Sequence, residues 1–147
     1  LPASDDAAEI DSSPTPARVE LPHGQGEVVL VVDDEAPIRA MLQRTLERFG
    51  YRVLCAAHGA EAIALFVTHR DRIDVVMTDM AMPVMDGAAL AVALRTMDAD
   101  LPIIAASGLD TSSKVAAARD SGVRHFITKP YSAETVLRVL RDVCKRA

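Results

Sequence analysis

The stretch RIDVVMTDMAMPVMDG, residues 72–87, decides the fold, because its apolar segment ends abruptly in a carboxylate, Asp79. The Met-Pro pair at residues 82–83 and the Asp-Gly pair at residues 86–87 then indicate a turn. An apolar run of this length predicts a buried strand. A charged group at the end of a buried strand costs desolvation free energy unless something nearby neutralises it. The partners of Asp79 must therefore come from elsewhere in the chain.

Similar apolar runs recur after residue 26 and alternate with helical patterns. We predict strands at residues 27–33, 51–57, 72–79, 101–107 and 123–129. The first and fourth runs are continuously apolar, which indicates burial on both faces. We predict helices along a stripe from Ile38 to Phe49 that Gly50 ends, and at residues 60–69, 87–96, 112–120 and 133–145, the last capped by Ser132. The fold class is α/β, a parallel sheet with helices on both faces.

The composition fits one domain preceded by a linker. Half of the 147 residues are hydrophobic and only 3% are aromatic, so we expect a single core of aliphatic side chains. Residues 1–26 are rich in proline and lack apolar periodicity, which predicts a flexible linker before a domain at residues 27–147. The linker holds five acids against Arg18, so most of the net charge of −5 lies there. The nearly neutral domain predicts no direct contact with nucleic acid or a membrane.

The two cysteines, Cys55 and Cys144, form no CxxC pair and are too few for a disulfide framework, which predicts a reducing compartment. No apolar run reaches the roughly 18 residues of a membrane span, and the first residues carry no export signal. We therefore expect a cytoplasmic protein. Since the chain begins without methionine, we also expect it to be a fragment of something longer.

Polar residues gather where the predicted strands end. Asp33 and Asp34 follow the first strand, Asp79 ends the third, Ser107 ends the fourth, and Lys129 ends the fifth. Ligands of such sheets bind at the carboxyl ends of the strands, so these side chains are expected to meet. Three carboxylates repel one another unless a cation joins them, and Mg²⁺ or Mn²⁺ fits a set of oxygen ligands. Capping of the following helix is the alternative, and for Asp34 alone both interpretations remain open.

These residues, with the Met-Pro and Asp-Gly pairs, resemble the receiver domain of bacterial two-component signalling, of the chemotaxis-response-regulator type. The resemblance covers residues 27–147 and implies a flavodoxin-like, doubly wound (βα)5 fold with strand order 2-1-3-4-5. It implies that Asp79 accepts a phosphoryl group from the phosphohistidine of a kinase. It further implies a set of metal ligands: Asp33, Asp34, Asp79 and the backbone carbonyl of Ala81.

The resemblance assigns the remaining strand-end residues to the phosphoryl group. Lys129 would compensate its charge, while Ser107 would donate a hydrogen bond and move toward it. The bond between Lys129 and Pro130 is expected to be cis. Ala81 and Leu109 occupy the positions that influence attack by water, and neither has a polar side chain, which predicts slow loss of the phosphoryl group.

Two further features bear on signalling. Phe126 matches the aromatic switch position of the family, with an ordinary core aromatic as the alternative. The helix at residues 112–120 has few large apolar residues, so it buries little area, and we expect it to shift when Asp79 is phosphorylated.

The segment GQGEVVLVVDDE, residues 24–35, resembles the junction into the terminal receiver of a hybrid sensor histidine kinase. We favour that origin, with a parent kinase that can be anchored in a membrane; a stand-alone single-domain response regulator is the alternative. The expected partners are a phosphohistidine domain in cis or in trans and a histidine phosphotransfer protein. The fourth and fifth helices would offer a face for a dimer. The receiver alone would not be a turnover enzyme.

Functions of other classes fit the residues less well. A haloacid-dehalogenase-like phosphohydrolase places a second Asp two residues after its nucleophile, where this chain has Ala81. A flavodoxin-like cofactor binder offers hydroxyl and N–H groups to a phosphate in its first loop. Here Asp33, Asp34 and Glu35 would repel that phosphate.

Overall fold

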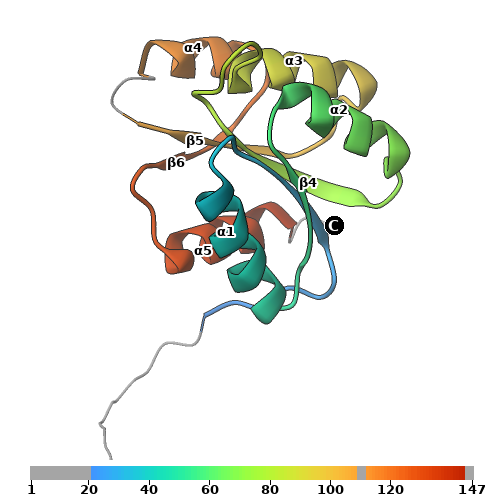
Figure 1. The fold of residues 1–147 in the computed structure, drawn as a ribbon, viewed down its shortest axis with the longest axis vertical. Helices are drawn as coiled ribbons and strands as arrows, with labels where there is room; N and C mark the ends of the chain where they lie inside the picture. Colours follow the sequence, from blue (N-terminus) through green and yellow to red (C-terminus); the bar gives the residue numbers. More distant parts are fainter. Residues whose placement is uncertain (1–20, 109–111, 145–147) are drawn as a thin grey trace, which may run out of the picture.

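The computed structural model describes residues 21–108 and 112–144. In these residues, five strands alternate with five helices, coloured along the chain in Figure 1. The strands are β2 (Val28–Val32), β3 (Arg52–Ala56), β4 (Ile73–Asp79), β5 (Ile103–Ser107) and β6 (His125–Thr128). The helices are α1 (Ala36–Arg48), α2 (Gly59–Thr68), α3 (Gly87–Met97), α4 (Ser112–Asp120) and α5 (Ala133–Cys144). Each predicted element is present, with its ends shifted by a few residues at most.

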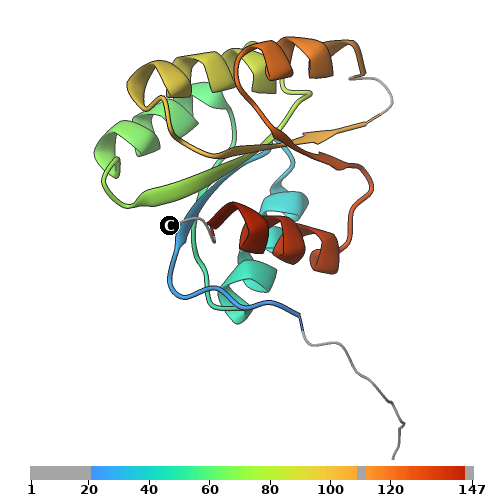
Figure 2. The ribbon, with the colours of Figure 1, turned by 180° about the vertical axis from the view of Figure 1, so that it is seen from behind.

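All neighbouring strands pair in parallel, in the order β3-β2-β4-β5-β6. This is the predicted flavodoxin-like order 2-1-3-4-5, counted along the chain. Helices α1 and α5 lie on one face of the sheet, and α2, α3 and α4 lie on the other (Figures 1 and 2). Helices on both faces allow successive side chains of one strand to be buried on opposite sides.

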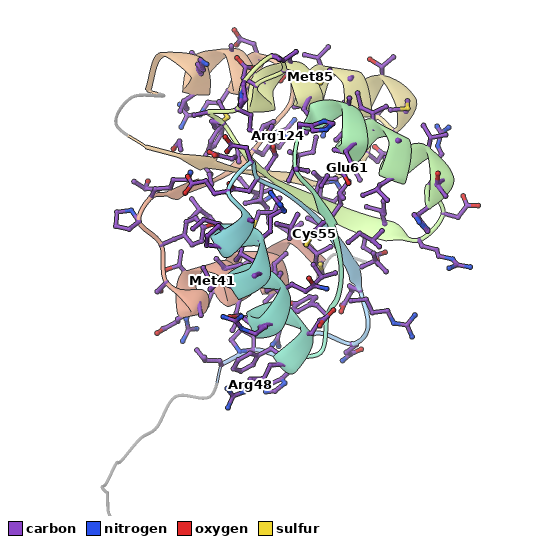
Figure 3. All side chains as sticks on the ribbon, in the orientation of Figure 1. Met41, Arg48, Cys55, Glu61, Met85 and Arg124 are labelled. Carbon is purple, nitrogen blue, oxygen red and sulfur yellow. The ribbon has the colours of Figure 1, made fainter. Side chains whose placement is uncertain are left out.

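The strand β2 shows how one apolar run serves two cores. Leu30 and Val32 point into the core beneath α2, α3 and α4, whereas Val29 and Val31 point into the core beneath α1 and α5. All four side chains are at most 1% exposed. Figure 3 shows the side chains that fill both layers between sheet and helices. The absence of polar alternation in the sequence is thus explained by burial on both faces.

Local signals in the sequence explain where helices begin. The side chain of Asp86 accepts a hydrogen bond from the N–H of Ala89 at 2.9 Å and caps α3. Ser132 accepts a hydrogen bond from the N–H of Thr135 at 3.2 Å at the start of α5, which confirms the predicted cap. Each cap satisfies a backbone donor that the first turn leaves free.

The turn after β4 depends on Gly87. A Cβ atom at this position would lie 2.6 Å from the backbone oxygen of Asp79, closer than side chains approach. Glycine therefore lets the start of α3 pack directly against the end of β4. Nearby, Val84 is fully exposed and has a φ of 67°, a conformation that costs a β-branched residue free energy.

Residues 21–26 lie against the end of α1. The N–H groups of Gly24 and Gly26 donate to the carbonyls of Phe49 and Gly50, at 2.7 Å and 2.8 Å. Leu21 packs on the core beneath α1 and α5. Residues 1–20 of the predicted linker lie outside the described residues, and the division at residue 27 remains a proposal. None of the helices in the described ranges is long and apolar enough to cross a membrane.

Two substitutions in α3 test the contribution of core packing to stability. We expect Leu90→Ala to lower the free energy of unfolding by about 2–5 kcal/mol, because the side chain is fully buried and leaves a cavity. Val92→Ala is the control in the same helix, because its side chain is 53% exposed. Urea denaturation should give Val92→Ala a free energy of unfolding within about 0.5 kcal/mol of the wild-type value. A similar loss in both variants would contradict the packing described above.

Candidate functional site

The pairing of β2 with β4 brings two buried acids together. Val32 is the register partner of Thr78, so the next residues along the two strands, Asp33 and Asp79, lie side by side. These two residues are 3% and 4% exposed, whereas Asp34 is exposed. One ligand oxygen from each of the three carboxylates lies within 4.8 Å of the others. The structure therefore brings together the three acids predicted at these strand ends.

Asp33 has an unfavourable environment for its charge. Burial raises the pKa of Asp33, and the charges of Asp79 and Asp34 add to this, while the Glu35 N–H and Lys129 oppose it. The N–H of Glu35 donates to Asp33 Oδ1 at 2.9 Å, and Arg39 of α1 donates to the Asp33 backbone carbonyl at 2.6 Å. These bonds hold the residue in place, although they do not remove the repulsion between the acids.

Lys129 supplies the cation of the site. Its Nζ lies 3.0 Å from Asp79 Oδ1, and its side chain is 31% exposed. Burial lowers the pKa of Lys129, but the hydrogen bond to Asp79 and the charges of Asp79, Asp33 and Glu35 outweigh it, so the pKa rises overall. The N–H of Ala81 donates to the same Asp79 oxygen at 3.2 Å. Lys129 therefore stays protonated and carries one positive charge against three carboxylates.

Ser107 and Lys129 come from neighbouring strand ends. Asp79 pairs in register with Ala106, one residue before Ser107, and the Lys129 N–H donates to the Ser107 carbonyl at 2.7 Å. Within the described residues, no hydrogen bond joins the Ser107 hydroxyl to Asp79 or Lys129. The bond between Lys129 and Pro130 is cis, as predicted.

Phe126 lies on β6. Its ring is partly buried and packs on the core beneath α2, α3 and α4, and the Arg119 guanidinium of α4 lies 5.1 Å from the ring centroid. These core contacts fit the alternative interpretation, in which Phe126 is an ordinary core aromatic. The switch role stays a prediction.

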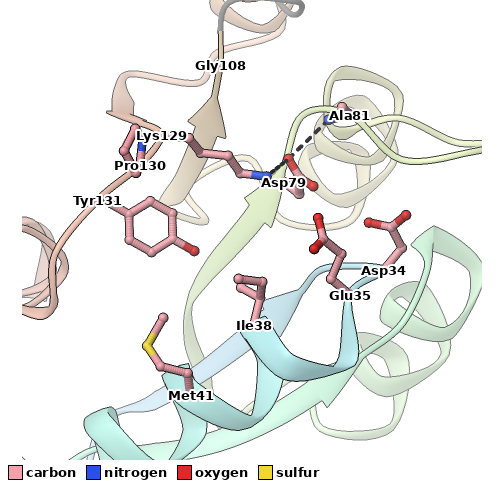
Figure 4. A pocket seen from close by; sticks show the side chains of 10 residues that line it. All are labelled: Asp34, Glu35, Ile38, Met41, Asp79, Ala81, Gly108, Lys129, Pro130 and Tyr131. Carbon is pink, nitrogen blue, oxygen red and sulfur yellow. Dashed lines mark hydrogen bonds and ion pairs between the residues drawn. The ribbon is translucent and has the colours of Figure 1, made fainter.

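The acids open into a cavity of about 610 Å³ (Figure 4). Its polar part contains Asp34, Glu35, Asp79 and Lys129. The other part is apolar and is lined by Ile38, Met41, Pro130 and Tyr131, with Ala81 and Gly108 completing the wall. Sequence reasoning missed the apolar part. Ile38 and Met41 lie on the predicted core-facing stripe of α1 and pack on the core beneath α1 and α5, and both also line the cavity.

The donor set suits a hard divalent cation. Two buried carboxylates and one exposed carboxylate offer oxygens to one point, and the single ammonium of Lys129 leaves the cluster with excess negative charge. A cation bound by oxygen would offset the desolvation that Asp33 suffers in the fold. Within residues 21–108 and 112–144, no sulfur or imidazole ligand joins this cluster, which disfavours softer metals.

Comparison with known proteins identifies the family. Residues 29–141 match the model of the response regulator receiver domain, and the chain belongs to this family. The family match confirms the predicted receiver rather than the phosphohydrolase or the flavodoxin-like cofactor binder.

The curated relatives are longer proteins. The chain is 36% identical over 118 residues to the response regulator MprA of Mycolicibacterium vanbaalenii, covering 80% of this chain and 50% of that protein. It is 37% identical over 120 residues to the probable transcriptional regulator ycf27 of Guillardia theta, covering 82% of this chain and 46% of that protein. The chain thus spans about half the length of the curated relatives it matches.

Solved receivers share the fold. The chemotaxis protein CheY4 of Vibrio cholerae is 36% identical, with a TM-score of 0.73 over 80% of this chain and 98% of that one. CheY of Borrelia burgdorferi, solved in a complex with CheX, BeF3 and Mg²⁺, is 30% identical, with a TM-score of 0.75 over 82% of this chain and 90% of that one.

Replacing the buried acid tests the electrostatic conflict. We expect Asp33→Asn to raise the free energy of unfolding in EDTA by on the order of 1 kcal/mol, because it removes a buried charge and keeps the acceptor for the Glu35 N–H. Asp34→Asn is the matched control, and its exposed side chain should change the value by less than about 0.5 kcal/mol. Urea denaturation measures both. If Asp33→Asn lowers the free energy of unfolding while Asp34→Asn does not, the negative charge of Asp33 is already compensated in the fold and the prediction is wrong.

Proposed function

We propose that this chain is a phosphoacceptor receiver, in which Asp79 takes a phosphoryl group from the phosphohistidine of a histidine kinase. The observation that carries the proposal is the contact of 3.0 Å between Lys129 Nζ and Asp79 Oδ1, beside a second buried acid. This arrangement gives one nucleophilic carboxylate, one fixed cation and a set of oxygen ligands. They open into one cavity that a donor side chain can enter.

The transfer requires little covalent chemistry from the protein. A P–O bond forms to an Asp79 oxygen while the P–N bond to the donor imidazole breaks, and the imidazole leaves with the electron pair. Charge spreads over the three remaining phosphoryl oxygens during transfer. Lys129 lies where it can compensate part of that charge. The Ala81 N–H, just after β4, and the Ser107 hydroxyl, at the end of β5, are further donors.

Mg²⁺ or Mn²⁺ belongs to the same proposal. Asp33, Asp34, Asp79 and the backbone carbonyl of Ala81 would hold the ion, and it would supply positive charge against the phosphoryl oxygens. The electrostatic support is the excess of three carboxylates over one ammonium. The Mg²⁺ in the complex of the related Borrelia CheY gives independent support from a member of the same family.

The parent protein can be of two kinds. The curated relatives named above are a response regulator and a probable transcriptional regulator, which favours a response regulator as the parent. The hybrid histidine kinase, a transferase, is supported only by the sequence of residues 24–35 and by the proline-rich segment before it. In either parent, the partners proposed are a phosphohistidine domain and a histidine phosphotransfer protein. A cytoplasmic location and a dimer through α4 and α5 complete the proposal.

Intact-mass analysis with acetyl phosphate and Mg²⁺ tests the acceptor. We expect one phosphoryl group on the wild type, none on Asp79→Ala, and none on the wild type in EDTA. Asp71→Ala is the control, because this exposed acid lies in the loop between α2 and β4 and should leave the modification intact. Modification of Asp79→Ala at the wild-type level would place the acceptor elsewhere.

The lifetime of the phosphoryl group tests the role of Ala81, which lines the cavity without a polar side chain. We expect Ala81→Asn to speed its loss by about fivefold, since one hydrogen bond to the attacking water supplies about 1 kcal/mol. Ala89→Asn, at an exposed position on α3, is the control. Intact-mass analysis over time measures the rate of phosphoryl loss in both variants. Equal rates in Ala81→Asn and Ala89→Asn would contradict the prediction. Leu109, the other predicted position, lies outside the described residues.

A further inference from the structure

Tyr131 is a cavity residue that the proposed transfer does not use. It follows Pro130 directly, and its ring is partly buried against the core beneath α1 and α5. It lines the cavity that holds Asp79 and Lys129, and it also lines a second, smaller space together with Asp33 and Asp79. Figure 4 shows the ring next to Ile38, with its hydroxyl directed toward the acidic part of the cavity.

The Tyr131 hydroxyl is not needed for packing. A phenylalanine ring would make the same apolar contacts. In the described part of the chain, no protein group forms a hydrogen bond with this hydroxyl. The oxygen is therefore a donor at the edge of a cluster of acceptors.

The surroundings keep this hydroxyl protonated. Burial raises the pKa of Tyr131 to about 12, and the negative charges of Asp33, Asp79 and Glu35 contribute in that order. A protonated hydroxyl among carboxylates can act toward them only as a donor. Asp33 is the acid with the largest electrostatic effect on it.

Asp33 has room for such a donor. Its Oδ1 accepts from the Glu35 N–H, and among the described residues no hydrogen bond reaches its second oxygen. Carboxylates that bind metals are commonly held by outer hydrogen bonds, which fix the oxygen that faces the ion. Loss of such a bond typically weakens metal binding by about 10–100-fold.

We propose that Tyr131 is a positioning residue of the metal site, whose hydroxyl donates a hydrogen bond to the Asp33 carboxylate when an ion is bound. This inference rests on the proposed function, because it requires that the acids bind a divalent cation. In this proposal Tyr131 contacts Asp33 and is not itself a ligand of the ion. It acts by holding Asp33 in the orientation that binds.

The second tyrosine of the chain is a matched control. Tyr51 is 4% exposed, lies directly before β3 and packs against Gly24, beside the segment that precedes the domain. Burial also raises the pKa of Tyr51 to about 12. Tyr51→Phe and Tyr131→Phe therefore remove the same atom from a buried and a half-buried ring, and only Tyr131 borders the three acids.

Mn²⁺ binding, followed by the electron paramagnetic resonance signal of the free ion, tests the proposal without any activity. We expect the dissociation constant of Tyr131→Phe to rise about tenfold or more over wild type, and that of Tyr51→Phe to stay unchanged. Thermal unfolding in EDTA checks that both variants are folded. An unchanged Mn²⁺ dissociation constant in Tyr131→Phe overturns the inference about Tyr131 but not the proposed metal site. A wild type that binds no Mn²⁺ overturns the metal site itself, and the inference with it.

Tyrosine fluorescence gives a second reading that does not depend on the Tyr131→Phe variant. The chain has two tyrosines and no tryptophan, so Tyr51→Phe leaves Tyr131 as the only strong emitter. We expect Mg²⁺ to change this emission. The Mg²⁺ concentration at half of the change should equal the Mg²⁺ dissociation constant, which is measured separately by displacement of bound Mn²⁺. Emission that stays constant through saturation contradicts a hydrogen bond formed on ion binding.

Discussion

The parallel pairing of β2 with β4 is the constraint on which the site depends. Because Val32 is in register with Thr78, the last buried positions of the two strands place Asp33 and Asp79 next to each other at one edge of the sheet. Two adjacent carboxylates that are almost fully buried oppose folding unless positive charge joins them. Lys129, from the end of β6, supplies part of that charge at 3.0 Å from Asp79. The fold thus maintains a deficit of positive charge at the point where a ligand can enter.

The turns around this point are built to keep it open. Gly87 allows α3 to begin directly behind Asp79, and the Asp86 cap fixes the first turn of that helix. Arg39 and the Glu35 N–H hold Asp33 from the opposite side. Asp33 and Asp79 are therefore held by the N–H groups of Glu35 and Ala81 and by the side chains of Arg39 and Lys129. This pre-arrangement lowers the cost of ordering the site when a ligand binds.

Helix α4 contacts the rest of the domain through Ala118 in the core and through two charged side chains. Lys114 forms an ion pair with Asp86 at 3.4 Å, and Arg119 lies over the Phe126 ring at 5.1 Å. Ala118 is buried, whereas the other side chains described from Lys114 to Asp120 are exposed or half-buried. Exposed charge contacts contribute little stability. The helix that the sequence predicted to be weakly held is thus attached in a way that fits this expectation, and its movement on phosphorylation stays a prediction.

The sequence by itself determined the α/β class, the order of elements and the strand-end acids, because continuous apolar runs, caps and turn residues act over a few neighbours. Asp33, Asp34, Asp79, Ser107 and Lys129 could be named because parallel strands all end at one edge. Only the tertiary structure decided which carboxylates meet within 4.8 Å, and that Lys129 Nζ lies 3.0 Å from Asp79 Oδ1. It alone revealed the apolar part of the cavity, since Ile38, Met41 and Tyr131 come from separate segments whose ordinary pattern is that of core residues. Register, side-chain direction and desolvation depend on contacts between distant segments, and no local pattern in the chain encodes them.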